Sequence, residues 1–206
     1  VERGSVYMSV EVEIKLKIED PEQLIEKLEG LGFIKGEQLL EIDGKYSFQY
    51  IEDSVFENCT FDNITALSGH SCVYYIKKGY TTVRNCNFTN INTCFGVLSI
   101  YDPDAGLNCN TSHMLVENSY FENNYATTEP GCINNCGQLI VKNSTFYKNS
   151  AFWWAGAIHT HSGANTTIYD SNFTDNVAGW NGGALYTYSY LQIYNTTFTS
   201  NNCTTN

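Results

Sequence analysis

The chain has 206 residues, a formal net charge of −11 and 42% hydrophobic residues. This length and apolar content exclude a disordered chain and are ample for a packed core. The acidic balance argues against a nucleic-acid partner, because no basic stripe is available to neutralise phosphates.

The first 45 residues differ in composition from the rest of the chain. They contain no Asn, Thr or Cys, yet they carry 17 of the 33 charged residues, whereas residues 46–206 contain all eight Cys. We therefore divide the chain into an N-terminal segment, residues 1–45, and a second region, residues 46–206. The N-terminal segment is interpreted as a native cap, as a truncated piece of another domain, or as a chimeric fusion.

The N-terminal segment predicts one strand and one helix. Residues 8–17 alternate in the pattern of a strand, which places Glu11, Glu13 and Lys15 on one face. A helix is expected over residues 20–31, because an Asp-Pro pair that suits a helix start precedes an apolar stripe. The purely structural interpretation is that the predicted strand and helix cover the open end of the region that follows them.

This strand and helix resemble the start of CYTH-type triphosphate tunnel enzymes over about 35 residues. The resemblance implies that Glu11 and Glu13 bind metal and that Lys15 contacts phosphate. That family needs a closed tunnel of further strands rich in Arg and Lys, and residues 46–206 contain a single Arg, Arg84. A residual triphosphatase or adenylate cyclase activity is therefore only the third functional hypothesis.

The second region carries a repeat marked by Phe. Six times a branched or aromatic apolar residue is followed five positions later by Phe, and the Phe-to-Phe spacings are 27, 33, 25, 27 and 25 residues. The six pairs are Phe56/Phe61, Val83/Phe88, Val116/Phe121, Val141/Phe146, Ile168/Phe173 and Ile193/Phe198. Self-similarity at such a period indicates a stacked architecture in which each repeat buries its apolar face against its neighbours.

Other positions of the repeat show the same regularity. Asn or Asp stands three residues before each Phe, a small residue stands five after it, and Gly-small pairs precede a second apolar position. Each repeat predicts two or three short strands separated by Asn, Gly and Ser turns. The prediction is an all-β, right-handed, single-stranded parallel β-helix of about six coils, the architecture of pectate lyases. Phe would fill its core, and Asn would satisfy its turn amides.

The repeat resembles that of polymorphic outer membrane proteins and related adhesin-like surface proteins over residues 50–206. The shared elements are F-x-x-N, as in Phe121–Asn124 and Phe146–Asn149, and G-G-A-L at Gly182–Leu185. The resemblance implies an extracellular or cell-surface β-helix that displays binding surfaces. We accordingly expect a non-catalytic adhesin-like protein with glycan or surface-protein partners, without membrane insertion by this stretch of chain.

The outer wall is predicted by aligning the coils twelve residues after each Phe. Two outward columns result: Tyr74, Ser99, Asn134, His159 and Tyr186, and then Ile76, Tyr101, Cys136, His161 and Tyr188. Trp153 and Trp180 share a third column. The candidate ligand-binding residues are Trp153, Trp180, His159, His161, Tyr186 and Tyr188. Aromatic strips flanked by polar groups suit sugar rings or a protein partner, although cross-strand ladders also simply stabilise a sheet.

A carbohydrate-active enzyme is the alternative function, because lyases and hydrolases share this architecture. Glycoside hydrolysis needs two facing carboxylates, and Asp102 and Asp104 flank a Pro on a loop that reads as a solvated turn. His159 and His161 point the same way on one strand, but the pattern offers no third ligand. We therefore assign no catalytic residue, no metal site and no cofactor.

The eight cysteines suggest an oxidising compartment. Cys59 and Cys86 occupy the same column on adjacent coils, within disulfide reach if the stack is regular, and Cys94 and Cys109 bracket the longest insertion. The alternative interpretation is that Cys serves as a small apolar filler.

Asn-X-Ser/Thr acceptors support a secreted, glycosylated surface. The candidate sites are Asn63, Asn87, Asn110, Asn165 and Asn172. The first 20 residues are charged and lack the apolar run of a signal peptide. If the protein is exported, we expect this sequence to be a fragment or part of a fusion.

Overall fold

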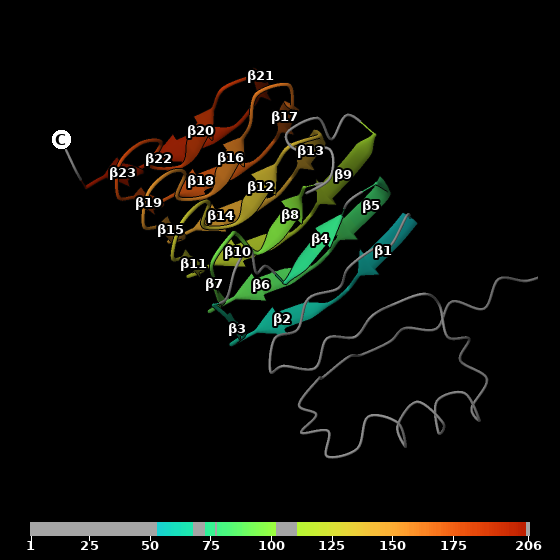
Figure 1. Cartoon of the computed structure of the whole chain (residues 1–206), viewed down its shortest axis with the longest axis horizontal. Helices are drawn as coiled ribbons and strands as arrows, with labels where there is room; N and C mark the ends of the chain where they lie inside the picture. The colour runs from blue at the N-terminus through green and yellow to red at the C-terminus, as the bar shows by residue number, and fades with distance from the viewer. Residues whose placement is uncertain (1–52, 68–72, 77, 102–110, 205–206) are drawn as a thin grey trace, which may run out of the picture. The chain divides into compact units, whose positions relative to one another are not determined.

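The computed structural model describes residues 53–67, 73–76, 78–101 and 111–204, and these residues form 23 β-strands and no helix. Four parallel sheets run along the molecule (Figure 1). The first contains β1 Asp53–Glu57, β5 Gly79–Arg84, β9 Ser112–Glu117, β13 Gln138–Lys142, β17 Asn165–Tyr169 and β21 Tyr190–Tyr194. The second contains β2 Thr60–Asp62, β6 Asn87–Thr89, β10 Tyr120–Glu122, β14 Thr145–Tyr147, β18 Asn172–Thr174 and β22 Thr197–Thr199.

The other two sheets complete each turn of the chain. The third contains β3 Thr65–Ala66, β7 Asn92–Thr93, β11 Tyr125–Ala126, β15 Ser150–Ala151, β19 Val177–Ala178 and β23 Asn202–Cys203. The fourth contains β4 Tyr74–Ile76, β8 Leu98–Ile100, β12 Ile133–Asn135, β16 Ile158–Thr160 and β20 Leu185–Thr187. Each strand pairs in parallel with the equivalent strand of the next turn, so the fold is a right-handed parallel β-helix of about five turns. The predicted right-handed parallel β-helix is confirmed, with about five turns instead of six and four short strands per turn instead of two or three. The predicted N-terminal strand and helix lie outside the described residues.

Aromatic rings stacked along the axis fill the core. The rings of Phe88, Phe121, Phe146 and Phe173 are fully buried, and consecutive rings in this run lie 4.6–4.8 Å apart and nearly parallel. This separation equals the spacing of neighbouring strands, about 4.8 Å. The Phe repeat therefore has a direct physical cause, because in-register pairing places identical residues in contact.

Two sets of Asn residues stabilise the turns. The Asn or Asp three residues before each Phe adopts a positive φ, between 44° and 57°, a conformation that Asn and Asp tolerate better than most residues. The Asn three residues after Phe is instead buried in the middle turns. Asn149, for example, donates hydrogen bonds to the Phe121 carbonyl and to Asn176 Oδ1, each at 3.0 Å. Asn149 Oδ1 also accepts a hydrogen bond of 3.1 Å from the backbone amide of Asn124, so the expectation that Asn side chains satisfy turn amides is confirmed.

The Gly-small element allows neighbouring turns to approach closely. A Cβ atom at Gly156 would lie 2.1 Å from the carbonyl oxygen of Gly183 on the next turn. No other residue fits there without moving the backbone, which explains why Gly recurs before the fourth strand.

The predicted outward columns are wrong in the first coil and at Cys136, which is buried in the hydrophobic core. Tyr74 pairs with Leu98 and Ile76 pairs with Ile100, and both Tyr74 and Ile76 are buried in the core. Tyr75, not Tyr74, is the partner of Ser99. The stretch between Phe and the fourth strand differs in length from coil to coil, and a shift of one residue exchanges the two faces of a strand.

The predicted disulfide between Cys59 and Cys86 is not formed. Both are free thiols, and Cys86 donates weak hydrogen bonds to the carbonyls of Phe56 and Arg84. Cys59 likewise donates a weak hydrogen bond of 3.3 Å to the carbonyl of Glu57. Cys94 is also a free thiol, while Cys109 lies outside the described residues, as does the whole N-terminal segment with Glu11, Glu13 and Lys15.

Candidate functional site

The fourth sheet carries a column of polar and aromatic side chains on its outer face. Ser99, Asn134, His159 and Tyr186 are successive in-register partners on β8, β12, β16 and β20. Asn134 Nδ2 donates a hydrogen bond of 3.0 Å to Ser99 Oγ. Because side chains alternate between the two faces of a strand, the core residue Ile158 next to His159 directs the imidazole outward.

The two histidines lie in contact. The ring centroids of His159 and His161 are 4.0 Å apart, and His161 Nε2 lies 2.7 Å from Asn134 Oδ1. Burial, together with repulsion from His159, lowers the pKa of His161 to about 4. The His161 ring is therefore neutral near pH 7 and keeps a nitrogen lone pair that can bind a proton donor or a metal.

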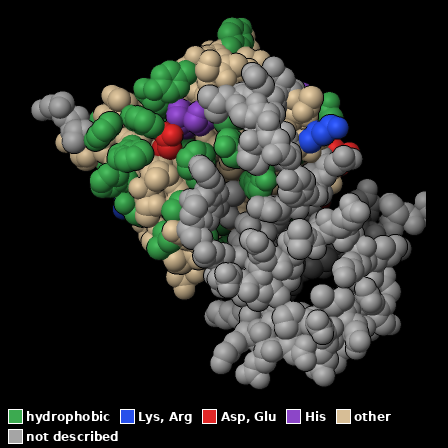
Figure 2. All heavy atoms as spheres, in the orientation of Figure 1, with side chains coloured by type: hydrophobic (Ala, Val, Ile, Leu, Met, Phe, Trp, Pro, Cys, Tyr) green, Lys and Arg blue, Asp and Glu red, His purple; other side chains and the backbone are tan. Residues whose placement is uncertain are grey.

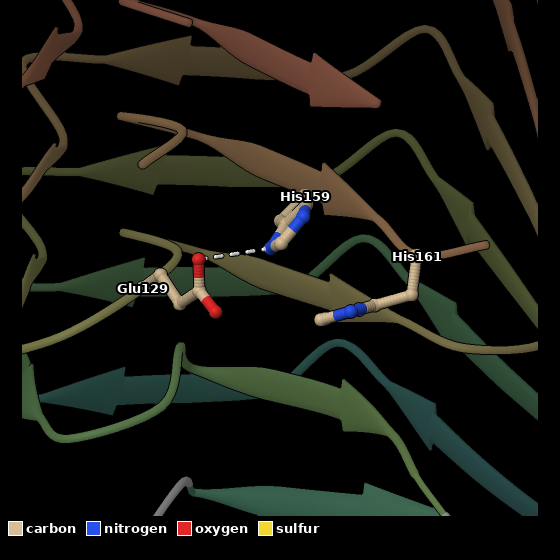
Figure 3. Close-up of side chains that lie close together, drawn as sticks. All are labelled: Glu129, His159 and His161. Carbon is tan, nitrogen blue, oxygen red and sulfur yellow. Dashed lines mark ion pairs between the residues drawn. The ribbon is translucent and has the colours of Figure 1, made fainter. Parts of the chain in front are cut away.

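Glu129 completes this group, and the sequence prediction missed it. It follows β11 on the preceding turn, and its Oε2 lies 3.2 Å from His159 Nδ1 (Figure 3). Figure 3 shows the carboxylate and both imidazole rings pointing toward one another. One ligand atom from each of the three side chains can be chosen so that all lie within 4.8 Å of one another. The expectation that no third candidate ligand is available is therefore wrong, whereas the assignment of no metal site stays a prediction.

Buried polar atoms without hydrogen-bond partners concentrate here. Within the described part of the chain they are Glu129 Oε2, Trp154 Nε1, both ring nitrogens of His159, Asn92 Oδ1 and Thr93 Oγ1. The first four belong to this one site. The 3.2 Å contact between Glu129 and His159 satisfies an ion-pair distance, but its alignment is not that of a hydrogen bond. Each such buried group costs about 1–3 kcal/mol when left unsatisfied.

Aromatic side chains surround the histidines, and we call Trp153, Trp154, Trp180, Tyr186 and Tyr188 the aromatic strip. Trp153 and Trp180 lie on adjacent turns with ring centroids 6.1 Å apart, and they are 37% and 51% exposed. Trp154 stacks on Tyr186 at 6.0 Å. Figure 2 shows the purple His and red acidic side chains set among green hydrophobic ones on this face.

The tyrosines end the strip with a polar edge. The hydroxyl of Tyr186 donates a hydrogen bond of 2.8 Å to that of Tyr188, and this bond raises the pKa of Tyr186. Tyr188 is exposed, and its ring contacts His159 at a centroid distance of 5.8 Å. The hydroxyl pair therefore offers hydrogen-bonding groups beside exposed ring faces.

The structure brings all six predicted ligand-binding residues into one cluster, but in two layers. Trp153, Trp180 and Tyr188 are exposed, whereas His159 is 1% exposed and His161 is partly buried. His159 is therefore a supporting group beneath the surface and not a free outward side chain.

Glycosylation candidates lie elsewhere on the wall. Asn63, Asn87 and Asn172 are exposed, while Asn165 is partly buried and donates a hydrogen bond to Gln138 Oε1 at 3.0 Å. Asn110 lies outside the described residues. Occupancy of these sites stays a prediction.

Comparison with known proteins identifies the family to which the repeat region is similar. A family model described as a right-handed beta helix region matches residues 42–206. No curated protein and no solved structure gives a significant match. Among the residues that the structure describes, no helix is both long and apolar enough to cross a membrane. The match covers most of the chain and agrees with the observed topology, so the chain belongs to the right-handed β-helix family.

Proposed function

We propose that this protein is a non-catalytic, adhesin-like β-helix of the cell surface or extracellular space that binds glycans through the aromatic strip. The observation that carries the proposal is that all three Trp residues of the chain lie on two adjacent turns of one face, two of them exposed. The β-helix fold is compatible with surface and carbohydrate-related proteins.

The exposed tryptophans are costly for folding alone. A Trp side chain buries up to about 250 Å², so leaving half of one in water forgoes on the order of 3 kcal/mol of hydrophobic stabilisation. Two such rings on neighbouring turns favour a binding role over a purely structural one. Sugar rings present apolar C–H faces, which stack on aromatic rings, and hydroxyls, which pair with polar groups such as the Tyr186–Tyr188 edge.

A glycan array probed with the full chain tests the proposal. We expect binding to a limited set of glycans and a loss of about tenfold in affinity, equivalent to about 1.4 kcal/mol, for Trp180→Ala. Tyr80→Ala is the matched control, because Tyr80 is 63% exposed but lies on β5 of the first sheet. Absence of glycan binding, binding to proteins alone, or equal binding by Trp180→Ala would contradict the proposal.

Residence outside the cytosol has its own test. Expression through a secretory pathway followed by glycopeptide mass spectrometry should find glycans at the exposed Asn63, Asn87 or Asn172. Asn165, whose amide is held by Gln138, should be occupied less. If the secreted chain carried no glycan at any of these sites, the glycosylation acceptors would no longer support an extracellular location.

A carbohydrate-active enzyme is the second candidate, and the buried carboxylate of Glu129 beside His159 is the observation that favours it. Hydrolysis requires a second carboxylate facing the first. Release of reducing ends from a glycan found on the array, abolished by Glu129→Gln, would establish the enzyme and overturn the non-catalytic proposal.

A further inference from the structure

The group formed by Glu129, His159 and His161 has the composition of a metal site. Two imidazoles and one carboxylate are the donor set that Zn²⁺ takes in many proteins, whereas Ca²⁺ and Mg²⁺ prefer oxygen ligands alone. We propose that these three side chains bind one divalent transition-metal ion, with Zn²⁺ as the natural occupant. This inference does not depend on the glycan-binding proposal.

The distances suit such an ion after small side-chain rotations. Ligands of a tetrahedral Zn²⁺ at bond lengths near 2.1 Å lie about 3.4 Å from one another. His159 Nδ1 and Glu129 Oε2 already lie 3.2 Å apart, and the three ligand atoms fall within 4.8 Å. Figure 3 shows the three side chains converging on one region. Glu129 comes from one turn, while His159 of β16 and His161, which directly follows β16, come from the next turn.

The unsatisfied atoms are the independent observation that points to a ligand. Glu129 Oε2 and His159 Nδ1 are buried and lack hydrogen-bond partners among the described residues. A metal ion would accept lone pairs from both atoms at once and remove the cost of leaving them unpaired. A simple ion pair would satisfy them only with better alignment than the structure has.

The surroundings resemble the outer shell of a metal centre. Asn134 Oδ1 contacts His161 Nε2 at 2.7 Å, and Asn134 is in turn fixed by its hydrogen bond to Ser99. Such outer contacts orient metal-bound imidazoles. The aromatic rings of Trp154 and Tyr186 pack against His159 at 6.3 and 5.3 Å and limit access of water. Three protein ligands would leave the fourth coordination position open.

Metal titration of the full chain, freed of metal by a chelator, tests the site. We expect one Zn²⁺ per chain by calorimetry, a higher melting temperature with Zn²⁺, and visible absorption bands of tetrahedral Co²⁺. Glu129→Gln and His161→Gln should each weaken Zn²⁺ binding at least tenfold. His113→Gln is the control, because His113 stacks on Tyr80 in the first sheet, away from Glu129.

Two outcomes would overturn the site without relying on any variant. The first is no stoichiometric Zn²⁺ binding by the wild-type chain, which would leave Glu129 and His159 as an ion pair only. The second is X-ray absorption of the Zn²⁺-loaded wild-type chain that shows sulfur ligands, which would assign the metal to the free cysteines. A first shell of nitrogen and oxygen with two imidazoles would support the proposal, and unchanged affinity in a folded His161→Gln variant would refute it.

Discussion

His159 Nδ1 lies 3.2 Å from Glu129 Oε2, although the two residues are 30 positions apart in the chain. Glu129 follows β11 on one turn, and His159 belongs to β16 on the next. The stack of coils brings them together, with Trp154 of the later turn packing against the same imidazole. The outer wall thus combines the buried pair of Glu129 and His159 with exposed aromatic rings nearer the solvent.

The Phe stack predicts a large cost for truncation at its centre. Phe146 lies between Phe121 and Phe173, with ring centroids 4.7 and 4.6 Å away. We expect Phe146→Ala to lower the free energy of unfolding by about 3–5 kcal/mol, measured by urea denaturation, because it leaves a cavity inside the stack. Phe152→Ala, at a position that is 57% exposed, should cost less than about 1 kcal/mol. Equal effects would refute the role of the stack.

The buried Asn ladder predicts a second difference. Asn149 donates two hydrogen bonds through its amide and accepts two at Oδ1, from the backbone and side-chain nitrogens of Asn124. Asn149→Ala should therefore lower the free energy of unfolding by about 4 kcal/mol in urea denaturation, since each of the four lost bonds contributes about 1 kcal/mol. The exposed Asn172→Ala is the control and should cost about 0.5 kcal/mol. A cost below 1 kcal/mol at Asn149 would contradict the ladder's role.

The reactivity of Cys86 should depend on pH in a specific way. Burial raises the pKa of its thiol to about 11, from an ordinary value of 9.0. Because the pKa of this thiol is higher in the folded chain than in the unfolded chain, its protonation contributes to the stability of the fold. This contribution is fully present below pH 9 and is lost as the pH rises through about 11.

Alkylation followed by mass spectrometry of the Cys86 peptide measures this shift, because the thiolate is the reactive form. In the native chain the rate should keep rising up to about pH 11, whereas in urea it should level off near pH 9. Coincident profiles in the two states would show that the thiol is not perturbed.

The sequence predicted the parts of the fold that repeat at a constant spacing. Coils of 25–27 residues placed Phe121, Phe146 and Phe173 in one stack, and parallel pairing in register requires that result. Where the spacing varies, prediction failed: Tyr74 lies thirteen residues after Phe61, but Leu98 lies ten after Phe88, so the first coil was assigned to the wrong face.

Of the candidate site, the sequence predicted the aromatic residues but not Glu129, because only residues in strands follow a regular pattern. The outer aromatic residues follow from alternation along each strand, but Glu129 lies in a turn with no strand pattern. Equal spacing after Ala126 and Ala151 places Glu129 at the same position as Trp154, and this alignment could have found it. The burial of His159 was not readable from the sequence, because it arises from side chains of neighbouring turns.

Tryptophan fluorescence tests the central claim most directly, because the only three Trp residues of the chain, Trp153, Trp154 and Trp180, all belong to the aromatic strip. Titration of the full chain with a glycan found on the array should shift or quench the emission, with a saturation curve that matches the calorimetric affinity. The response should weaken in Trp180→Ala and persist in Tyr80→Ala. Glycan binding that saturates in calorimetry without any change in emission would place the binding surface elsewhere and contradict the account.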